Sequence, residues 1–271
     1  MTPESMPTDT VTLRSLETLR DFEACVALQR ETWGRDYRGC VPAALLMVAQ
    51  KVGGVTAGAF DADGTLLGFV FGITGYSGGH PLHWSHMLAV RESARDAGLG
   101  IRLKLYQREL LLENGVERAC WTFDPLVAKN AHINLNRLGA VVVDHVENMY
   151  GDSNSALHAG LGTDRFVVEW RLADERVTRC IAGLEHIDAT AFAASPVVND
   201  MTPPASAPES RVRIEIPADI YVILERAPRE AAKWRARTRG AVQRYLAKGY
   251  TVAAFYREAA SGRCFYGLAP R

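Results

Sequence analysis

An apolar strand, a glycine-containing loop and a long helix follow one another over residues 82–113, and this segment constrains the fold most strongly. Leu82–Val90 has the length and composition of a strand, and Leu99–Glu113 repeats apolar residues at helical spacing. The loop between them, Arg95–Gly100, reads RDAGLG. Glycines in such a turn let backbone N–H groups approach an anion at the positive end of a helix. The segment predicts a phosphate-binding loop, with an ordinary helix-leading turn as the alternative.

Two other phosphate-binding motifs do not fit this loop. It lacks the Gly-Lys-Ser/Thr ending of a P-loop, and it lacks the third glycine of a dinucleotide-binding fingerprint. The sequence therefore predicts neither a P-loop nor a dinucleotide-binding loop at this position.

The pattern of apolar runs predicts an α/β fold. Helices and strands are mixed without strict alternation, so we expect a sheet with mixed strand directions. Strands are expected at 11–14, 55–60, 65–73, 82–90, 118–123, 140–145 and 165–172, and helices from Thr18, at 42–52, at 99–113 and at about 127–138. Thr18 and Asp21 form a candidate capping box at the start of the first helix.

Composition changes divide the chain into four parts. Residues 1–10 hold no hydrophobic region, so we expect a flexible lead-in and no signal peptide. The main domain is expected at 11–174, followed by a connector at 175–210 that ends in a proline-rich linker. Residues 211–271 predict a strand–helix–strand–strand unit, which is too small to fold alone and should pack on the first sheet.

Charge and cysteine usage exclude several classes of protein. Lys plus Arg and Asp plus Glu both total 31, whereas a general nucleic-acid binder carries a basic excess. The five cysteines are scattered without CxxC spacing, which argues against a disulfide framework or a metal site and for the reducing cytoplasm. No apolar run approaches the roughly 20 residues of a membrane span, so no membrane contact is expected.

Two motifs in order resemble the GNAT superfamily of acyltransferases. Leu88–Val90 followed by Arg95-x-x-Gly98-x-Gly100 resembles its signature strand and loop. Asn130–Ala140 is similar to its next helix, which ends in a basic residue, a spacer and a glycine. The resemblance spans residues 11–172 and implies a mixed, mostly antiparallel sheet flanked by helices.

The resemblance also implies an activity. It points to an acyl-coenzyme-A-dependent N-acyltransferase in which a small amine attacks the thioester directly. Ser85–Val90, Asn130–Asn134 and Gly162–Arg165 resemble a branch of about 270 residues that acylates amino acids, in some members from succinyl-CoA. Acetyl-CoA or succinyl-CoA would be a co-substrate, with no tightly bound cofactor.

Contacts with coenzyme A are implied along the strand, the loop and the next helix. Backbone groups of the strand would bind the pantetheine arm, and N–H groups of the loop would bind the diphosphate. The two asparagines would bond the pantetheine amides or merely cap their helix. The implied residues are Leu88, Ala89, Val90, Arg95, Asp96, Ala97, Gly98, Leu99, Gly100, Asn130 and Asn134.

His86 is the candidate general base, against the alternative of a structural histidine. The superfamily's usual acidic position falls at Trp84, and strand alternation predicts Trp84, His86 and Leu88 on one face. His83, on the other face, is expected to be solvated. The tyrosine that often protonates the leaving thiolate is replaced by Leu135, so no general acid is assigned, and water or another side chain must supply the proton.

Two basic features remain open. Arg165 is a candidate clamp for a substrate carboxylate, or one half of a surface ion pair with Asp164. The helix Arg229–Lys248 carries a basic side that could bind nucleic acid or the 3′-phosphate of coenzyme A, or simply face solvent.

Two other functions compete with the enzyme. One is a non-catalytic acyl-CoA-binding sensor on the same fold, and the other is a nucleic-acid binder that uses the basic helix. The sequence leaves open the acyl donor, the acceptor and its chirality, the role of the C-terminal segment and the oligomeric state, a homodimer among the options.

Overall fold

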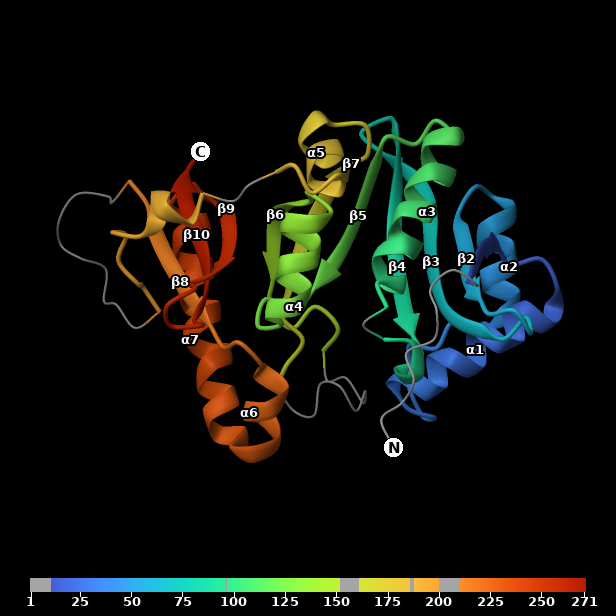
Figure 1. Cartoon of the computed structure of the whole chain (residues 1–271), viewed down its shortest axis with the longest axis horizontal. Helices are drawn as coiled ribbons and strands as arrows, with labels where there is room; N and C mark the ends of the chain where they lie inside the picture. Colours follow the sequence, from blue (N-terminus) through green and yellow to red (C-terminus); the bar gives the residue numbers. More distant parts are fainter. Residues whose placement is uncertain (1–10, 96, 152–160, 186–187, 200–209) are drawn as a thin grey trace. The chain divides into compact units, whose positions relative to one another are not determined.

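The computed structural model describes residues 11–95, 97–151, 161–185, 188–199 and 210–271 (Figure 1). These residues fall into two compact units. The first unit comprises residues 11–121 and 171–173, and the second comprises 122–151, 161–170 and 174–271.

The first unit is built on strands in the order β1-β2-β3-β4-β5. Neighbours pair antiparallel except β4 and β5, which are parallel. This mostly antiparallel arrangement confirms the expected fold class. The elements are β1 (Thr12–Ser15), α1 (Leu19–Trp33), α2 (Ala43–Lys51), β2 (Val55–Phe60), β3 (Leu66–Ser77), β4 (His80–Val90), α3 (Leu99–Glu113) and β5 (Arg118–Phe123).

Helices α1 and α2 cover one face of this sheet. The Thr18 side chain accepts from the N–H of Asp21, and the Asp21 carboxylate accepts from the N–H of Thr18, which confirms the predicted capping box. Buried residues of both helices form a continuous apolar core with Phe69 and Phe71 of β3. The helical spacing of apolar residues in the sequence is thus explained by burial against β3.

Helix α3 covers the opposite face of the same sheet. Gly68 of β3 lies beneath it, and a Cβ there would meet the Leu103 side chain at 3.2 Å and the Ala89 carbonyl oxygen at 2.9 Å. A larger residue at 68 would push the helix from the strand. This close approach holds the start of α3 against the end of β4.

The second unit contains the antiparallel pair β6 and β7 and a three-stranded sheet in the order β8-β10-β9. Its elements are α4 (Ala128–Ala131), a π-helix (His132–Arg137), β6 (Val141–Val146), β7 (Arg165–Arg171), α5 (Glu175–Ile181), β8 (Val212–Ile216), α6 (Ile220–Arg226), α7 (Pro228–Ala247), β9 (Tyr250–Arg257) and β10 (Cys264–Pro270). The three strands and the long helix expected in the C-terminal segment are present, with a further short helix, α6, between β8 and α7. Helices α5 and α6 were not predicted, because each has only seven residues and no full apolar period.

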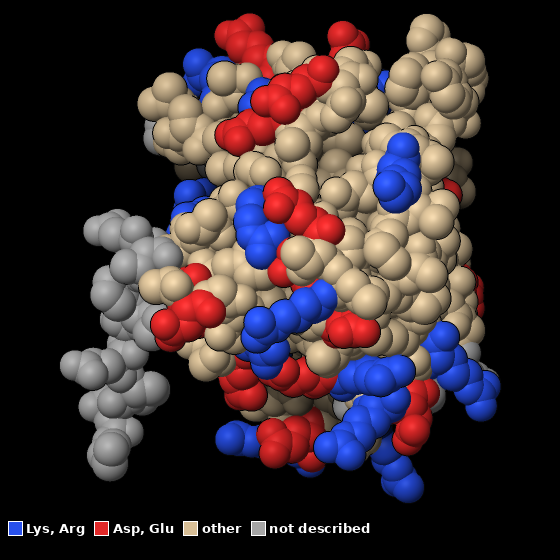
Figure 2. All heavy atoms as spheres, turned by 90° about the vertical axis from the view of Figure 1, so that its right-hand side faces the viewer, with Lys and Arg blue, Asp and Glu red and all other residues tan. Residues whose placement is uncertain are grey.

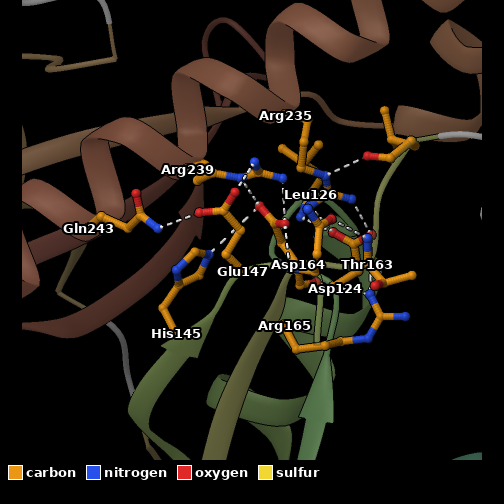
Figure 3. Close-up of polar contacts among 12 residues, drawn as sticks. Asp124, Leu126, His145, Glu147, Thr163, Asp164, Arg165, Arg235, Arg239 and Gln243 are labelled. Carbon is orange, nitrogen blue, oxygen red and sulfur yellow. Dashed lines mark hydrogen bonds and ion pairs between the residues drawn. The ribbon is translucent and has the colours of Figure 1, made fainter. Parts of the chain in front are cut away.

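The C-terminal segment packs on residues 122–170 through apolar and charged contacts. The buried Tyr266 ring packs edge-on against Phe166, with the ring centroids 5.3 Å apart. The Tyr266 hydroxyl donates to the Pro125 carbonyl at 2.8 Å. Arg235 of α7 donates two bonds to Asp124, at 2.8 and 2.5 Å (Figure 3). The expected packing of this segment is therefore observed within the second unit.

Helix α7 does not present all its cations to solvent. Arg239 forms a bidentate pair with Asp164 at 2.8 and 2.7 Å, and Arg235 is 5% exposed. These two residues lie one turn apart on the helix and point at carboxylates that follow β5 and precede β7 (Figure 3). Two of the basic residues on this helix, Arg235 and Arg239, therefore stabilise the second unit and do not face solvent as free cations.

The face presented in Figure 2 carries Lys, Arg, Asp and Glu side chains interspersed, in keeping with equal numbers of positive and negative residues. Among the described residues, no helix combines the length and hydropathy that crossing a membrane requires.

Removing the Arg235 guanidinium should destabilise the protein strongly. In Arg235→Met the Asp124 carboxylate, whose side chain is 12% exposed, loses its bidentate partner. Breaking a buried pair in this way costs about 3–5 kcal/mol. Denaturant unfolding should show this loss, whereas Arg229→Met on an exposed position of the same helix should change stability by less than about 0.5 kcal/mol. Equal stability of the two variants would contradict a structural role for the Asp124–Arg235 pair.

Candidate functional site

Strand β4 contains a β-bulge at His86. Its register with β3 pairs Ser85 with Gly72 and Met87 with Phe71, so His86 has no opposite residue. A bulge inserts one residue into the ladder, bends the strand and re-aims side chains, often beside active sites. The candidate base therefore lies at the one irregular position of this strand pair.

The bulge also changes which residues share a face. Beyond it, Leu88 pairs with Val70 and lies under α3, where a Cβ on Gly100 would contact it at 3.6 Å. The His86 ring instead packs edge-on against Phe71, with the ring centroids 6.1 Å apart, on the side of α1 and α2. The expectation that His86 and Leu88 share a face is wrong, because simple alternation ignores the extra residue. His86 is exposed, and desolvation by neighbouring groups lowers its pKa.

The pairing of β4 with β5 is much shorter than its pairing with β3. The parallel ladder comprises His83 with Ala119 and Trp84 with Cys120. Ser85 and Trp121 are the first residues past this ladder, and we call the region that begins between them the fork. Backbone groups of β4 that point away from β3 lie along this side of the strand.

Alternation tells which backbone groups those are. The N–H of Arg91 donates to Leu67 of β3, so Ala89, two residues earlier, also directs its backbone toward β3. Leu88 and Val90 then direct theirs away from β3, and the Val90 carbonyl accepts from Arg95 Nε at 3.3 Å. Of the three strand residues expected to contact pantetheine, the geometry favours Leu88 and Val90 over Ala89.

The loop after β4 ends at the N-terminus of helix α3. Gly98 is the N-cap of α3 and adopts the left-handed conformation, with φ of 72°, which favours glycine. No side chain caps the helix, and the N–H groups of Leu99 and Gly100 have no acceptor among the described residues. Arg95 is exposed and Ala97 half-buried, while Asp96 lies outside the described residues. These donors and the helix dipole suit an anion.

A chain of buried polar groups runs beneath α3. His83 Nδ1 lies 2.9 Å from Thr74 Oγ1, and its Nε2 lies 3.0 Å from Gln107 Nε2. Ser85 Oγ donates to Gln107 Oε1 at 2.8 Å and accepts from Lys104 Nζ at 2.6 Å. The expectation that His83 is solvated is wrong, because α3 covers it completely and its relative exposure is 0%.

Burial lowers the pKa of both titratable residues in this series of hydrogen bonds, His83 and Lys104. Desolvation, with a smaller contribution from Lys104, lowers the pKa of His83 to about 3. Desolvation also lowers the pKa of Lys104 to about 7. Sequence reasoning missed Lys104 and Gln107, although two polar residues three apart on the apolar side of a helix were a visible signal.

The helix that carries Asn130 and Asn134 is not regular. Its second half is a π-helix, in which Leu138 N–H donates to the Ile133 carbonyl five residues back. Asn130 is exposed and Asn134 is 7% exposed, so they do not share a surface as one α-helical turn would predict. Leu135 is buried and carries no proton to donate. π-Turns of this kind occur often at functional sites.

Arg165 lies in a buried charged cluster of the second unit (Figure 3). Its NH1 lies 3.7 Å from Asp124 and donates to the Asp164 carbonyl at 2.9 Å, and the guanidinium stands 5.4 Å from the Tyr150 ring. The Asp164 carboxylate instead pairs with Arg239. The alternative of a surface ion pair between Asp164 and Arg165 is therefore wrong, since both residues are buried.

Nearby, His145 of β6 approaches the same cluster. Its Nε2 lies 3.9 Å from the Asp164 carboxylate, and burial is the main cause that lowers its pKa. Sequence reasoning missed Asp124, Arg235 and Arg239, because their partners are up to 111 residues away along the chain. The structure thus describes the strand, bulge and loop in one unit and Asn130, Asn134 and Arg165 in the other.

Comparisons with known proteins give structural likenesses only. No family model matches the chain, and no curated protein matches it. Among solved structures, an acetyltransferase of the GNAT family from Streptococcus pneumoniae is 17% identical, with a TM-score of 0.47, over 59% of this chain and 98% of that one. The ribosomal-protein-S18-alanine N-acetyltransferase from Escherichia coli is 17% identical, with a TM-score of 0.47, over 61% and 97%.

An aminoglycoside 6'-N-acetyltransferase complexed with coenzyme A is 16% identical, with a TM-score of 0.45, over 60% of this chain and 98% of that one. With TM-scores below 0.5, these likenesses carry no argument about this chain.

Burial of His83 predicts a loss of stability in acid. Its pKa is about 3 in the folded state and about 6.5 in an unfolded chain, so between these values only the unfolded state binds the proton. Stability should fall as the pH falls from 6.5, with a slope of at most about 1.4 kcal/mol per pH unit from this residue. His83→Gln should unfold with a shallower acid slope in denaturant titrations at pH 4–7. An identical slope in both proteins would show that His83 does not set it.

Proposed function

We propose that this chain is an acyl-coenzyme-A-dependent N-acyltransferase of the GNAT kind. It transfers an acetyl or succinyl group to the amine of a small acceptor, an amino acid, in the reducing cytoplasm that its cysteines indicate. The observation that carries the proposal is the sequence of features along one segment. They are a bulged strand, backbone groups directed away from β3, and a helix N-terminus whose first N–H groups have no acceptor among the residues that the structure describes.

Each feature suits one part of an acyl-CoA. The N–H groups of Leu99 and Gly100 would hold the diphosphate at the positive end of α3. Leu88 and Val90 would bond the amides of the pantetheine arm through their backbone. A strand N–H near the bulge would polarise the thioester carbonyl as negative charge develops on its oxygen.

The reaction requires one proton to be removed and one to be supplied. An acceptor amine is mostly protonated at neutral pH, and neutral His86 would remove its proton before or during attack. The nitrogen then bonds to the acyl carbon, and the carbon–sulfur bond breaks. Direct transfer, without a covalent acyl-enzyme, is proposed.

The finer substrate proposal rests on Arg165 and on the resemblance to amino-acid acyltransferases. A guanidinium presents a planar fork of donors that matches a carboxylate, and such bonds are stronger where water is excluded. The Arg165 side chain is 8% exposed, which provides such surroundings. We propose residues 11–174 as the acyl-CoA-binding domain and 211–271 as a C-terminal segment that supports Arg165 through Asp124.

A second function is favoured by one observation. Leu135 is buried where many GNAT proteins place a proton-donating tyrosine, which would suit an acyl-CoA-binding sensor that does no chemistry. A matrix of acetyl- and succinyl-CoA against L- and D-amino acids, read by thiol release, decides between them. Release above the no-acceptor rate supports the enzyme, and binding without release supports the sensor.

Gly98→Glu should abolish coenzyme A binding. Wild-type protein should melt at a higher temperature with coenzyme A, since a ligand that binds only the folded state stabilises it. A glutamate at 98 adds negative charge beside the proposed diphosphate and should remove the shift. Gly115→Glu is a matched control, because Gly115 ends the same helix with φ of 70° and open space around it.

The two glycine variants carry the same backbone strain, so only the loop assignment separates them. A folded Gly98→Glu protein that keeps the full coenzyme A shift would contradict the assignment. A loss of the shift in both variants would attribute it to strain in α3.

His86→Gln should lower the acylation rate at pH 7 by at least about tenfold and leave the coenzyme A melting shift intact. Desolvation lowers the pKa of His86 below 6.5, so the wild-type rate should fall as the pH drops through that lowered pKa and the imidazole becomes protonated. The variant should lack this acidic limb. His80→Gln, on the exposed β3–β4 hairpin, should keep both rate and limb. An unchanged profile in His86→Gln would leave His86 a structural residue.

A further inference from the structure

Lys104 is a buried cation without an acidic partner. Its side chain reaches from α3 to the sheet, where Nζ lies 2.6 Å from Ser85 Oγ and 3.3 Å from Gln107 Oε1. Lys104 is 6% exposed, and no carboxylate of the described residues lies within 4.0 Å of it. The ring of Trp121 lies beside it, with Nζ 3.8 Å from the centroid.

The hydrogen bonds around Lys104 run in one direction. Ser85 Oγ accepts from Lys104 and donates to Gln107 Oε1, which leaves the Gln107 amide NH₂ to donate to His83 Nε2. His83 Nδ1 must then carry the hydrogen and donate to Thr74 Oγ1. A protonated His83 would set two N–H donors against each other at Gln107. The chain therefore keeps His83 neutral and leaves Lys104 as its single exchangeable charge.

Burying the Lys104 ammonium without a carboxylate partner among the described residues costs stability. A buried ammonium with neutral partners loses most of its hydration, and a methionine of similar length would fill the same space with no charge. A cation–π contact with Trp121 offsets only part of this cost. Stability alone does not explain why a lysine occupies this position.

Lys104 also stands where the proposed chemistry begins. Ser85 is the β4 residue just before the bulge, and Trp121 is the first β5 residue past the parallel ladder. Lys104 contacts both, so its amine lies at the base of the fork. The same helix begins at the proposed diphosphate loop, about one and a half turns before Lys104.

We infer that Lys104 supplies, through Ser85, the proton that the departing thiolate needs. The inference rests on the proposed acyl transfer. As the carbon–sulfur bond breaks, its electron pair stays on sulfur. The Ser85 hydroxyl turns from Gln107 Oε1 to the sulfur, which takes the hydroxyl proton. Ser85 recovers a proton from the Lys104 ammonium, which becomes a neutral amine. The proton lost by the attacking nitrogen returns to Lys104 by way of solvent, so no charge is gained or lost overall.

The titration of Lys104 suits this role. Burial lowers its pKa to about 7, so the ammonium is present at neutral pH and can release its proton, whereas an ordinary lysine near 10.5 would hold it. Ser85, Gln107 and Trp121 are uncharged, and His83 stays neutral above about pH 3, so no other group facing Lys104 titrates in this range. Acting through Ser85, Lys104 is a positioning residue that supplies a proton.

The test compares two thiol leaving groups in Lys104→Met and wild type. The variant should fold, keep its coenzyme A melting shift and lose at least about tenfold in kcat with acetyl-CoA. The second donor is the acetyl thioester of an acidic aryl thiol, whose thiolate departs without needing a proton. With this donor the variant and wild type should differ in kcat by less than about threefold. Lys51→Met, on an exposed position of α2, is the control and should match wild type with both donors.

A pH profile and a second variant complete the experiment. Wild-type kcat should fall as the pH rises above about 7, because Lys104 loses its proton, and Lys104→Met should lack this basic limb. Lys104→Arg keeps a charge that cannot be released and should be as slow as Lys104→Met.

Three results would overturn the inference while wild type remains active. They are an equal loss with both donors and an unchanged pH profile, a loss of the coenzyme A shift, and a loss restricted to the KM of succinyl-CoA, which would make Lys104 an anchor for an acyl carboxylate. An inactive wild type would instead refute the proposed function.

Discussion

The antiparallel ladder between β3 and β4 is the constraint on which the candidate site depends. It runs over ten register pairs and is interrupted once, at His86. Because paired backbone groups cannot shift without losing hydrogen bonds, the position of the extra residue fixes which side chains face each layer. His86 is thereby turned toward Phe71, while Leu88 lies under α3. The direction of the backbone groups of Leu88 and Val90 follows from the same ladder.

Two glycines, one in β3 and one in the loop after β4, determine how helix α3 is placed and how it begins. Glycine at 68 lets the helix lie close to β3, and Gly98 takes the left-handed conformation that starts the helix without a side-chain cap. The N–H groups of Leu99 and Gly100 at its start and the buried amine of Lys104 further along are therefore held by one rigid element. A helix fixed in this way can hold an anion site and a proton donor in a constant relation to each other.

Charge is buried differently in the second unit. There the two aspartates of the charged cluster have guanidinium partners: Asp124 pairs with Arg235, and Asp164 with Arg239 (Figure 3). These bidentate pairs join α7 to the residues after β5 and before β7, and Arg165 lies among them. In the first unit, no carboxylate of the described residues pairs with Lys104, and this contrast distinguishes a charge that supports structure from one available for chemistry.

The sequence alone determined the elements and the loop. Apolar periodicity located most of the strands and the longer helices, the Thr18–Asp21 capping box marked the start of α1, and RDAGLG marked the start of α3, because these signals are local and depend on residues a few positions apart. It could not locate the bulge at His86, since a strand's alternation does not reveal where its partner skips a residue. It placed His83 in solvent, since burial there is decided by α3, more than twenty residues away. It missed Asp124, Arg235 and Arg239 for the same reason. Which polar residues are buried, and beside which partner, was decided only by tertiary structure, because burial and charge pairing depend on contacts between segments that are distant along the chain.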